Sequence, residues 1–151
     1  DEGPIVAQKK IDVAPWPPWN SKLEKTLMQE GGILLAQILP QWISGYIDAH
    51  EQNHDIATYS EKIKKEDGLL DLKDDPYKNL LKIRAYEGWP GTYTFFERPS
   101  TSSGQAPAKR IRVGIIDAHM ETNRLIIDTV KPEGKREMSY EEFLRSGAKP
   151  I

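Results

Sequence analysis

The 151-residue chain is long enough to bury the core of one domain or of two small ones. Its 38% apolar and 29% charged residues are typical of a folded protein in water and exclude a chain that is disordered throughout. It has no cysteine, no apolar run near the roughly 20 residues of a membrane helix, and no basic start typical of a signal peptide. We therefore expect a cytoplasmic protein without disulfides or a membrane partner.

The formal net charge of −2 is unevenly distributed. Residues 1–58 hold four basic and eight acidic side chains, whereas residues 59–151 hold 17 basic and 15 acidic ones. So small an excess usually belongs to a solvated surface and is a weak sign of nucleic-acid binding. The placement of the basic residues is more informative, because they gather around two loops. The first group is Arg98, Lys109, Arg110 and Arg112, and the second is Lys131, Lys135 and Arg136.

The first twenty residues are predicted to be mostly irregular. A Gly-Pro turn leads into a short strand-type run at residues 5–7. Residues 12–20 (DVAPWPPWN) hold three prolines, which neither a helix nor a central strand tolerates. We expect Trp16 and Trp19 to pack this loop against apolar surface. Asp1 stands beside the Gly-Pro bend, where a carboxylate can be aimed into a cleft, although an acid at a chain end is more often solvated.

Residues 21–45 are predicted to form a long helix. Ser21 and Glu24 have the spacing of a capping box, and apolar residues recur after them at helical intervals. A pair of adjacent glycines weakens the middle of the helix, Pro40 bends or restarts it, and Gly45 ends it. We interpret the apolar stripe as part of a core.

Residues 50–54 (HEQNH) match the H-E-x-x-H pattern, in which two histidines one helical turn apart bind zinc and the glutamate activates water. That chemistry requires a helix, whereas the flanking residues favour extended or turn structure. It also requires a third ligand, and His119 is the only other histidine. We expect no metal site here and keep zinc hydrolysis as an alternative that metal analysis would test.

Residues 59–75 are predicted to be a charged connector between domains. Lys62, Lys64 and Lys65 give it a basic stretch, and Gly68 supplies a turn. Its leucines can hold part of it in place. A solvated linker is the simpler interpretation of the lysines, and contact with an RNA backbone is the functional alternative.

The remainder is predicted to be a helix followed by several strands. Asp75 and Pro76 suit the cap and the first position of a helix that runs to about Tyr86. After a Gly-Trp-Pro-Gly corner, which can be no more than a packed turn, β-branched and aromatic residues indicate a strand. Strands are expected at residues 92–98, 110–116 and 125–130, and a Ser139-capped helix up to Arg145. Such a series of short strands is typical of a small β-barrel.

Several motifs in a fixed order give the chain a family resemblance. Residues 84–93 (RAYEGWPGTY) resemble the I-R-A-F-x-x-W-P-G-A-Y segment that opens the C-terminal domain of methionyl-tRNA formyltransferases. The likeness continues at residues 57–63 (ATYSEKI), 65–68 (KEDG) and 131–135 (KPEGK). Residues 1–8 (DEGPIVAQ) resemble the D-x-G-P-I-x-x-Q stretch of the same family. The polar loop at 99–108 is longer than in the family, and we assign no function to it.

The resemblance implies an α+β architecture with three parts. Residues 1–58 would be the end of a Rossmann-like α/β formyltransferase domain, residues 59–75 a basic linker, and residues 76–151 an OB-like β-barrel that binds tRNA. The implied reaction transfers a formyl group from 10-formyltetrahydrofolate to the amino group of methionyl initiator tRNA, in translation initiation and without a metal. Because the chain starts at Asp1 without Met, we expect it to be a fragment of a longer protein. We also expect it to be a monomer and to be inactive by itself.

The resemblance also implies roles for individual residues. Asp1 matches an Asp that acts in the family beside an Asn and a His, neither of which has a counterpart here, so Asp1 is the catalytic and donor-binding candidate. The candidates for tRNA contact are Lys62, Lys64, Lys65, Arg84, Lys109, Arg110, Arg112, Lys131, Lys135 and Arg136. The alternative function is a stand-alone RNA-binding module of OB type without catalysis, which the missing Asn, His and folate pocket favour.

Overall fold

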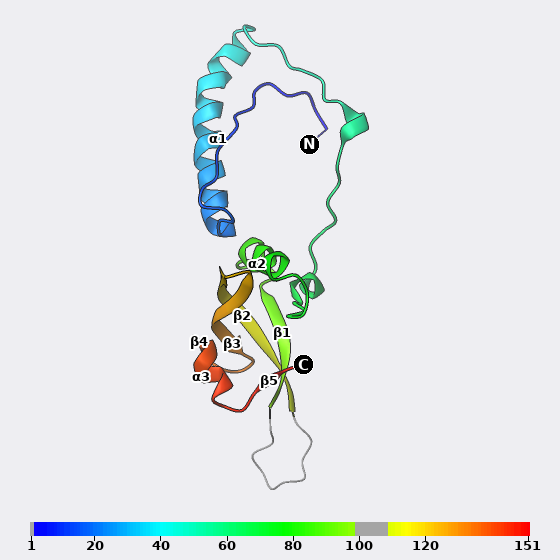
Figure 1. The fold of residues 1–151 in the computed structure, drawn as a ribbon. Coiled ribbons are helices and arrows are strands. Elements are labelled where there is room, and N and C mark those ends of the chain that lie inside the picture. The colour runs from blue at the N-terminus through cyan, green and yellow to red at the C-terminus, as the bar shows by residue number, and fades with distance from the viewer. Residues whose placement is uncertain (1, 99–108) are drawn as a thin grey trace. The chain divides into compact units, whose positions relative to one another are not determined.

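A computed structural model of the chain describes residues 2–98 and 109–151. They divide into two compact units, the first ending at Lys62 and the second beginning at Ile63 (Figure 1). No helix in the described residues combines the length and the hydropathy needed to cross a membrane.

The first unit is built on one long helix, α1 (Asn20–Ile43). The predicted capping box is wrong, because the N-cap position is Trp19 and no side chain makes a capping hydrogen bond there. Pro40 lies inside the helix, so the helix continues past this residue and does not restart there. The prediction that Gly45 ends the helix is confirmed: its φ of 73° leaves the right-handed region, and its N–H donates to the carbonyl of Trp42.

The apolar stripe of α1 is not core within the described residues. No residue of the helix is buried, and the side chains of Leu35 and Ile43 are 61% and 75% exposed. Val6 and Ala7 lie against the stripe, where an open apolar groove of about 280 Å³ remains. Trp16 is also 63% exposed, so the expectation that it packs against apolar surface is wrong. Too little chain in this unit covers these side chains for helical spacing to produce burial.

Hydrogen bonds join residues near the start of the first unit to residues near its end. Ile5 and His50 form an isolated antiparallel bridge with N–H to O distances of 2.8 and 2.9 Å. Beside it, the Gln52 amide donates to the carbonyl oxygen of Gly3 at 2.7 Å. A three-residue 3-10 turn, η1 (His54–Ile56), follows.

The second unit is α+β, with a five-stranded antiparallel sheet in the order β4-β3-β2-β1-β5 (Figure 1). In chain order its elements are η2 (Lys65–Gly68), α2 (Pro76–Ala85), β1 (Thr92–Arg98), β2 (Lys109–Glu121), β3 (Arg124–Pro132), β4 (Met138–Ser139), α3 (Tyr140–Leu144) and β5 (Lys149–Pro150). The expected helices and three strands are all present. The two-residue strands β4 and β5 were not predicted, because so short a run carries no readable periodicity.

Strand β2 is longer than its sequence indicated. It continues past residue 116 through a bulge at Asp117 and pairs with β3 up to Glu121. A two-residue turn of Thr122 and Asn123, with φ of 45° and 62°, joins the two strands, as in a tight hairpin with two left-handed residues. Residues 117–121 (DAHME) alternate polar and apolar side chains, but the predicted strand ended at residue 116.

The core of the second unit lies between one face of the sheet and its helices. Phe96, Val113 and Val130 are fully buried. The ring of Phe96 meets that of Phe143 from α3 edge to face, with centroids 5.0 Å apart. The predicted caps are confirmed: Asp75 accepts the Lys78 N–H at 2.7 Å for α2, and Ser139 accepts the Glu142 N–H at 3.2 Å for α3.

Part of the expected linker is packed onto β1. Leu70 is 1% exposed, and its N–H donates to the carbonyl of Tyr93 at 2.8 Å. Gly68 approaches the Trp-Pro-Gly corner so closely that a Cβ there would lie 2.1 Å from the carbonyl oxygen of Gly91. Glycine is therefore required at position 68 by close backbone approach. The chain consequently enters the second unit in a defined position beside β1.

Candidate nucleic-acid interface

One face of the β1–β2 ladder turns away from the core and places arginines over aromatic rings. Alternation along β1 buries Thr92, Thr94 and Phe96 and leaves Tyr93 and Phe95 on the other face. Exposed Arg112 has its Cζ 3.7 Å from the centroid of the Tyr93 ring, and exposed Arg110 has its Cζ 3.8 Å from that of Phe95. The two rings also meet edge to face, with centroids 5.8 Å apart.

Neighbouring strands extend this face with two lysines. Lys131 of β3 is paired with Gly114, which is itself paired with Tyr93, so these three residues form one row across the sheet. At the end of the ladder, Lys149 is paired with Glu97. Lys131 also lies 3.4 Å from Glu137. We call Tyr93, Phe95, Arg110, Arg112, Gly114 and Lys131 the arginine face. Cations prevail on this face, as an RNA-binding surface requires.

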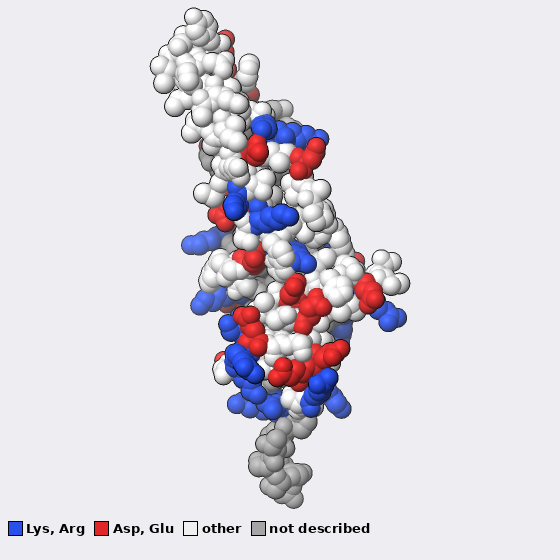
Figure 2. All heavy atoms as spheres, turned by 90° about the vertical axis from the view of Figure 1, so that its left-hand side faces the viewer, with Lys and Arg blue, Asp and Glu red and all other residues white. Residues whose placement is uncertain are grey.

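A second basic group lies on the opposite side of the sheet. Arg98 and Lys109, which are paired across β1 and β2, line a pocket of about 350 Å³ together with Lys135. Glu133 and Glu142 also line it. Figure 2 shows basic side chains gathered at this end of the second unit, next to a band of acidic ones. The structure thus separates Lys109 from Arg110, because consecutive strand residues point to opposite faces.

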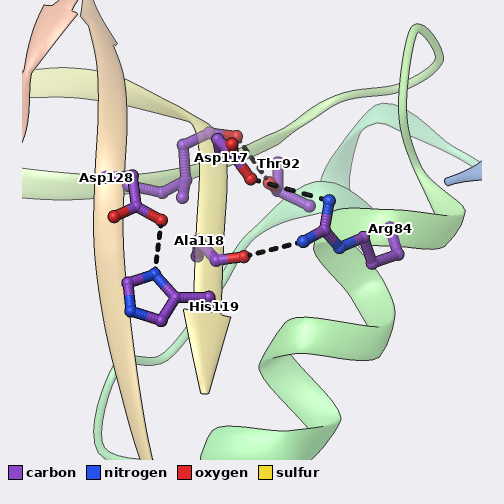
Figure 3. Close-up of polar contacts among 7 residues, drawn as sticks. Arg84, Thr92, Asp117, Ala118, His119 and Asp128 are labelled. Atoms are coloured by element: carbon purple, nitrogen blue, oxygen red, sulfur yellow. Dashed lines mark hydrogen bonds and ion pairs between the residues drawn. The ribbon is translucent and has the colours of Figure 1, made fainter. Parts of the chain in front are cut away.

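Arg84 serves the fold of the second unit. Its Nη2 donates to the carbonyl of Ala118 at 3.1 Å, and its Nη1 lies 3.6 Å from Oδ1 of Asp117 (Figure 3). Its side chain is only 18% exposed. Beside it the hydroxyl of Thr92 donates to the carbonyl of Ile115 at 3.0 Å. Arg84 therefore joins α2 to the bulge of β2, a use that the sequence did not reveal.

Sequence reasoning also missed the pair formed by His119 and Asp128 on the β2–β3 hairpin. Nδ1 of His119 lies 2.7 Å from Oδ2 of Asp128 (Figure 3). This hydrogen bond raises the pKa of His119 above 6.5, with smaller contributions from the charges of Asp128, Glu121 and Asp117. We assign the pair no catalytic role. Only the unforeseen length of β2 brings the two side chains together.

The other candidate cations lie on the surface of the second unit or just before it. Lys62, Lys64 and Lys65 are exposed around the start of η2, where the backbone N–H of Lys64 donates to Asp67 at 2.7 Å. Arg136 is exposed in the turn between β3 and β4. Their positions permit contact with a phosphate backbone, but they belong neither to the arginine face nor to the residues that line the pocket.

The H-E-x-x-H segment lacks the helix that zinc chemistry needs. His50 is extended in its bridge with Ile5, and His54 begins the short turn η1. The two imidazoles therefore do not share a helical face. Among the residues that the structure describes, no group of three or more His, Asp or Glu side chains is placed to hold a metal ion.

Two predictions fall outside the described residues. Asp1, the catalytic and donor-binding candidate, is one of the residues not described, and the polar loop at 99–108 is the other undescribed segment. The proposed role of Asp1 stays a prediction.

Comparison with known proteins agrees with the order of motifs. The family model described as the C-terminal domain of formyl transferases matches residues 62–147. A methionyl-tRNA formyltransferase of Chloroflexus aurantiacus is 38% identical over 96 residues, covering 64% of this chain and 31% of that protein. The methionyl-tRNA formyltransferase of Thermotoga maritima is 36% identical over 126 residues, covering 83% of this chain and 38% of that protein. That of Carboxydothermus hydrogenoformans is 30% identical over 164 residues, covering 100% of this chain and 52% of that protein. The chain spans about a third to a half of these curated relatives.

Proposed function

Because the chain belongs to the family of formyl transferase C-terminal domains, we propose that it is the distal part of a methionyl-tRNA formyltransferase. The observation that carries this proposal is the family match over residues 62–147, together with relatives of that name that align along the whole chain. The complete enzyme would transfer a formyl group from 10-formyltetrahydrofolate to methionyl initiator tRNA. We further propose that it acts as a cytoplasmic monomer.

The second unit would hold the tRNA. Its five-stranded antiparallel sheet, with α3 packed on β3 and β4, is compatible with an OB-like barrel, a fold that binds nucleic acids on its strands and loops. Exposed Lys and Arg side chains on both sides of the sheet would contact phosphates and provide affinity that falls as salt rises. Because Arg84 donates a hydrogen bond to the carbonyl of Ala118, we do not include Arg84 in the proposed tRNA-binding surface.

The chemistry would take place beside the first unit. The neutral amine of the esterified methionine attacks the formyl carbon, which passes through a tetrahedral intermediate and needs an oxyanion donor and a proton acceptor. By family analogy an Asn and a His supply these functions, and Asp1 orients or charges that His. Without these partners Asp1 has no mechanistic task, so we expect no formyl transfer from residues 1–151 alone.

The experiment that tests this proposal measures tRNA binding and formyl transfer with the 151-residue chain. We expect weak tRNA binding that declines steeply with salt, and no transfer. Replacing Lys109, Arg110 and Lys135 together by Gln should reduce the slope of log affinity against log salt by up to about three. The control replaces three exposed lysines of the first unit, Lys10, Lys22 and Lys25, and should leave the slope unchanged. Absence of tRNA binding at low salt would contradict the proposal.

The alternative, a stand-alone RNA-binding module without catalysis, predicts the same binding. The two differ in the coding sequence upstream of Asp1. An open reading frame that continues there with a His-bearing segment, for roughly the length of another domain, supports the enzyme.

A further inference from the structure

Building on the proposed RNA-binding function, we propose that the arginine face is a stacking platform for unpaired nucleotides, not only a set of phosphate contacts. The two parts of this claim are distinct. Lysines and arginines anywhere on a surface attract a phosphate backbone, whereas bases need flat groups to stack on. The arginine face offers such groups in two adjacent stacks, Arg112 on Tyr93 and Arg110 on Phe95.

The geometry of the stacks leaves one side of each guanidinium open. With Cζ 3.7 and 3.8 Å from the ring centroids, each guanidinium is in van der Waals contact with its ring on the protein side. Both arginines are exposed, while the rings beneath them are partly buried. A nucleobase can stack on the outer side of a guanidinium plane, and the N–H groups at its edge remain able to bind phosphate.

The rings also hold the arginines in place before any ligand arrives. A free arginine loses considerable rotamer freedom when it is immobilised on binding, and a cation held against an aromatic ring has already lost part of it. Tyr93 and Phe95 are themselves positioned by the ladder, because their neighbours Thr94 and Phe96 are buried on the core side. The platform is therefore preorganised by the sheet.

Gly114 adds room for a base at the centre of the face. It lies in the row between Tyr93 and Lys131, and its backbone is not in the left-handed region that favours glycine. A Cβ at this position would meet its nearest atom, the carbonyl oxygen of Lys131, at an ordinary 3.5 Å. The fold thus does not require glycine here, although glycine weakens a strand. A glycine at this position allows a nucleobase to approach the backbone closely, which accounts for its presence in the strand.

The charges of the face fit a polyanion that passes over it. Lys131 lies in the row next to Arg112, and Lys149 lies beyond Glu97, which is paired with Arg110. Acids near these cations include Glu97, Glu133, whose N–H donates to the carbonyl of Arg112, and Glu137, which is already engaged with Lys131. Phosphates flanking a stacked base would therefore meet cations on both sides. Duplex RNA hides its base faces, so it gains only the phosphate contacts.

The test compares two single strands of equal length and charge, one with bases and one in which abasic spacers replace them. The protein is the 151-residue chain, and the readout is the dissociation constant of each strand. We expect the wild-type chain to bind the base-bearing strand about tenfold more tightly, because each base that stacks on a guanidinium adds favourable contact. In the double variant R110K/R112K, which keeps both charges but loses both planes, this preference should fall to about twofold or less.

Controls separate loss of stacking from loss of fold or charge. The salt dependence should stay the same in R110K/R112K, because the number of cations is unchanged. Arg124→Lys, at an exposed arginine on the far end of the β2–β3 hairpin, should retain the full preference for bases. Gly114→Thr, a residue that suits a strand, should reduce binding of the base-bearing strand more than that of the abasic strand.

The outcomes distinguish this inference from the function on which it rests. If the chain binds both strands equally well and R110K/R112K behaves as wild type, RNA binding stands and the stacking platform is refuted. If R110K/R112K weakens both strands by the same factor, the arginines act only on phosphates and the platform is again refuted. If the wild-type chain binds neither strand nor tRNA at low salt, both proposals fail.

Discussion

Helix α1 and strand β1 each place side chains on one face at regular spacing, yet only the strand has a buried face. Along β1 every second residue from Thr92 to Phe96 is buried, and the ring of Phe96 meets that of Phe143 from α3. Along α1 no residue is buried, and an open groove follows the apolar stripe. Periodicity states which side chains share a face, but a face becomes core only when other parts of the chain cover it. The predictions below test this difference, beginning with the largest effect.

Truncation of a side chain should be costly in the sheet and nearly neutral in the helix. We expect Phe96→Ala to lower the free energy of unfolding of the second unit by about 3–5 kcal/mol, because a fully buried ring is removed. Leu35→Ala, at a residue that is 61% exposed on α1, should change the free energy of unfolding by less than about 0.5 kcal/mol. Denaturant unfolding followed by circular dichroism measures both. Equal losses would show that the stripe of α1 is covered.

Glycine replacements should have opposite signs in the two units. Gly68→Ala places a Cβ 2.1 Å from the carbonyl oxygen of Gly91, and we expect it to destabilise the second unit by about 1–3 kcal/mol. Gly31→Ala has open space within α1 and should stabilise the helix by about 1 kcal/mol. Thermal unfolding of both variants is the measurement. A neutral Gly68→Ala would indicate that residues 65–70 are not held against β1.

Ion pairs should differ in the same way. Arg84→Met removes a donor from the carbonyl of Ala118 and should cost about 1–3 kcal/mol, because the Arg84 side chain is largely enclosed. Lys9→Met breaks the exposed pair between Lys9 and Glu30 of the first unit and should cost less than about 1 kcal/mol. Chemical denaturation of the two variants is compared with wild type. If the Arg84 variant retains wild-type stability, the link between α2 and the bulge of β2 does not contribute to the free energy of unfolding.

The smallest effect is expected at His119, whose side chain is exposed although its hydrogen bond is short. Because the pKa of His119 is raised in the folded state, its pairing with Asp128 stabilises the fold below pH 6.5, and this stabilisation disappears as pH rises through the folded pKa. NMR titration should show that Asp128→Asn lowers the pKa of His119. An unchanged titration midpoint would mean that the contact with Asp128 does not persist in solution.

The sequence predicted well the features that depend on neighbouring residues. The cap at Asp75, the cap at Ser139 and the strand at Thr92–Arg98 were all foreseen, because capping and alternation are local properties. The cap at Ser21 was wrong for an equally local reason. The N-cap of α1 is Trp19, two residues before the predicted cap, so Ser21 is already inside the helix.

The candidate interface was only partly predictable. The sequence singled out the basic residues but treated Lys109, Arg110 and Arg112 as one group around a loop. The structure divides them between two faces, and it pairs Arg110 and Arg112 with rings on the neighbouring strand. No property of the sequence near Arg84 indicated that its guanidinium would meet a carbonyl 34 residues away.

The sequence by itself determined the family, the helices α1, α2 and α3, the presence of the three longer strands, and which side chains alternate along the predicted strands, since these follow from short motifs and local backbone preferences. Only the tertiary structure decided which faces are covered, that Gly68 must lack a side chain, and that the guanidinium groups of two arginines contact aromatic rings. These properties depend on distances between residues remote in the chain. Such distances are set by strand register and packing, and neither can be read from the composition of the chain or from the spacing of residues along it.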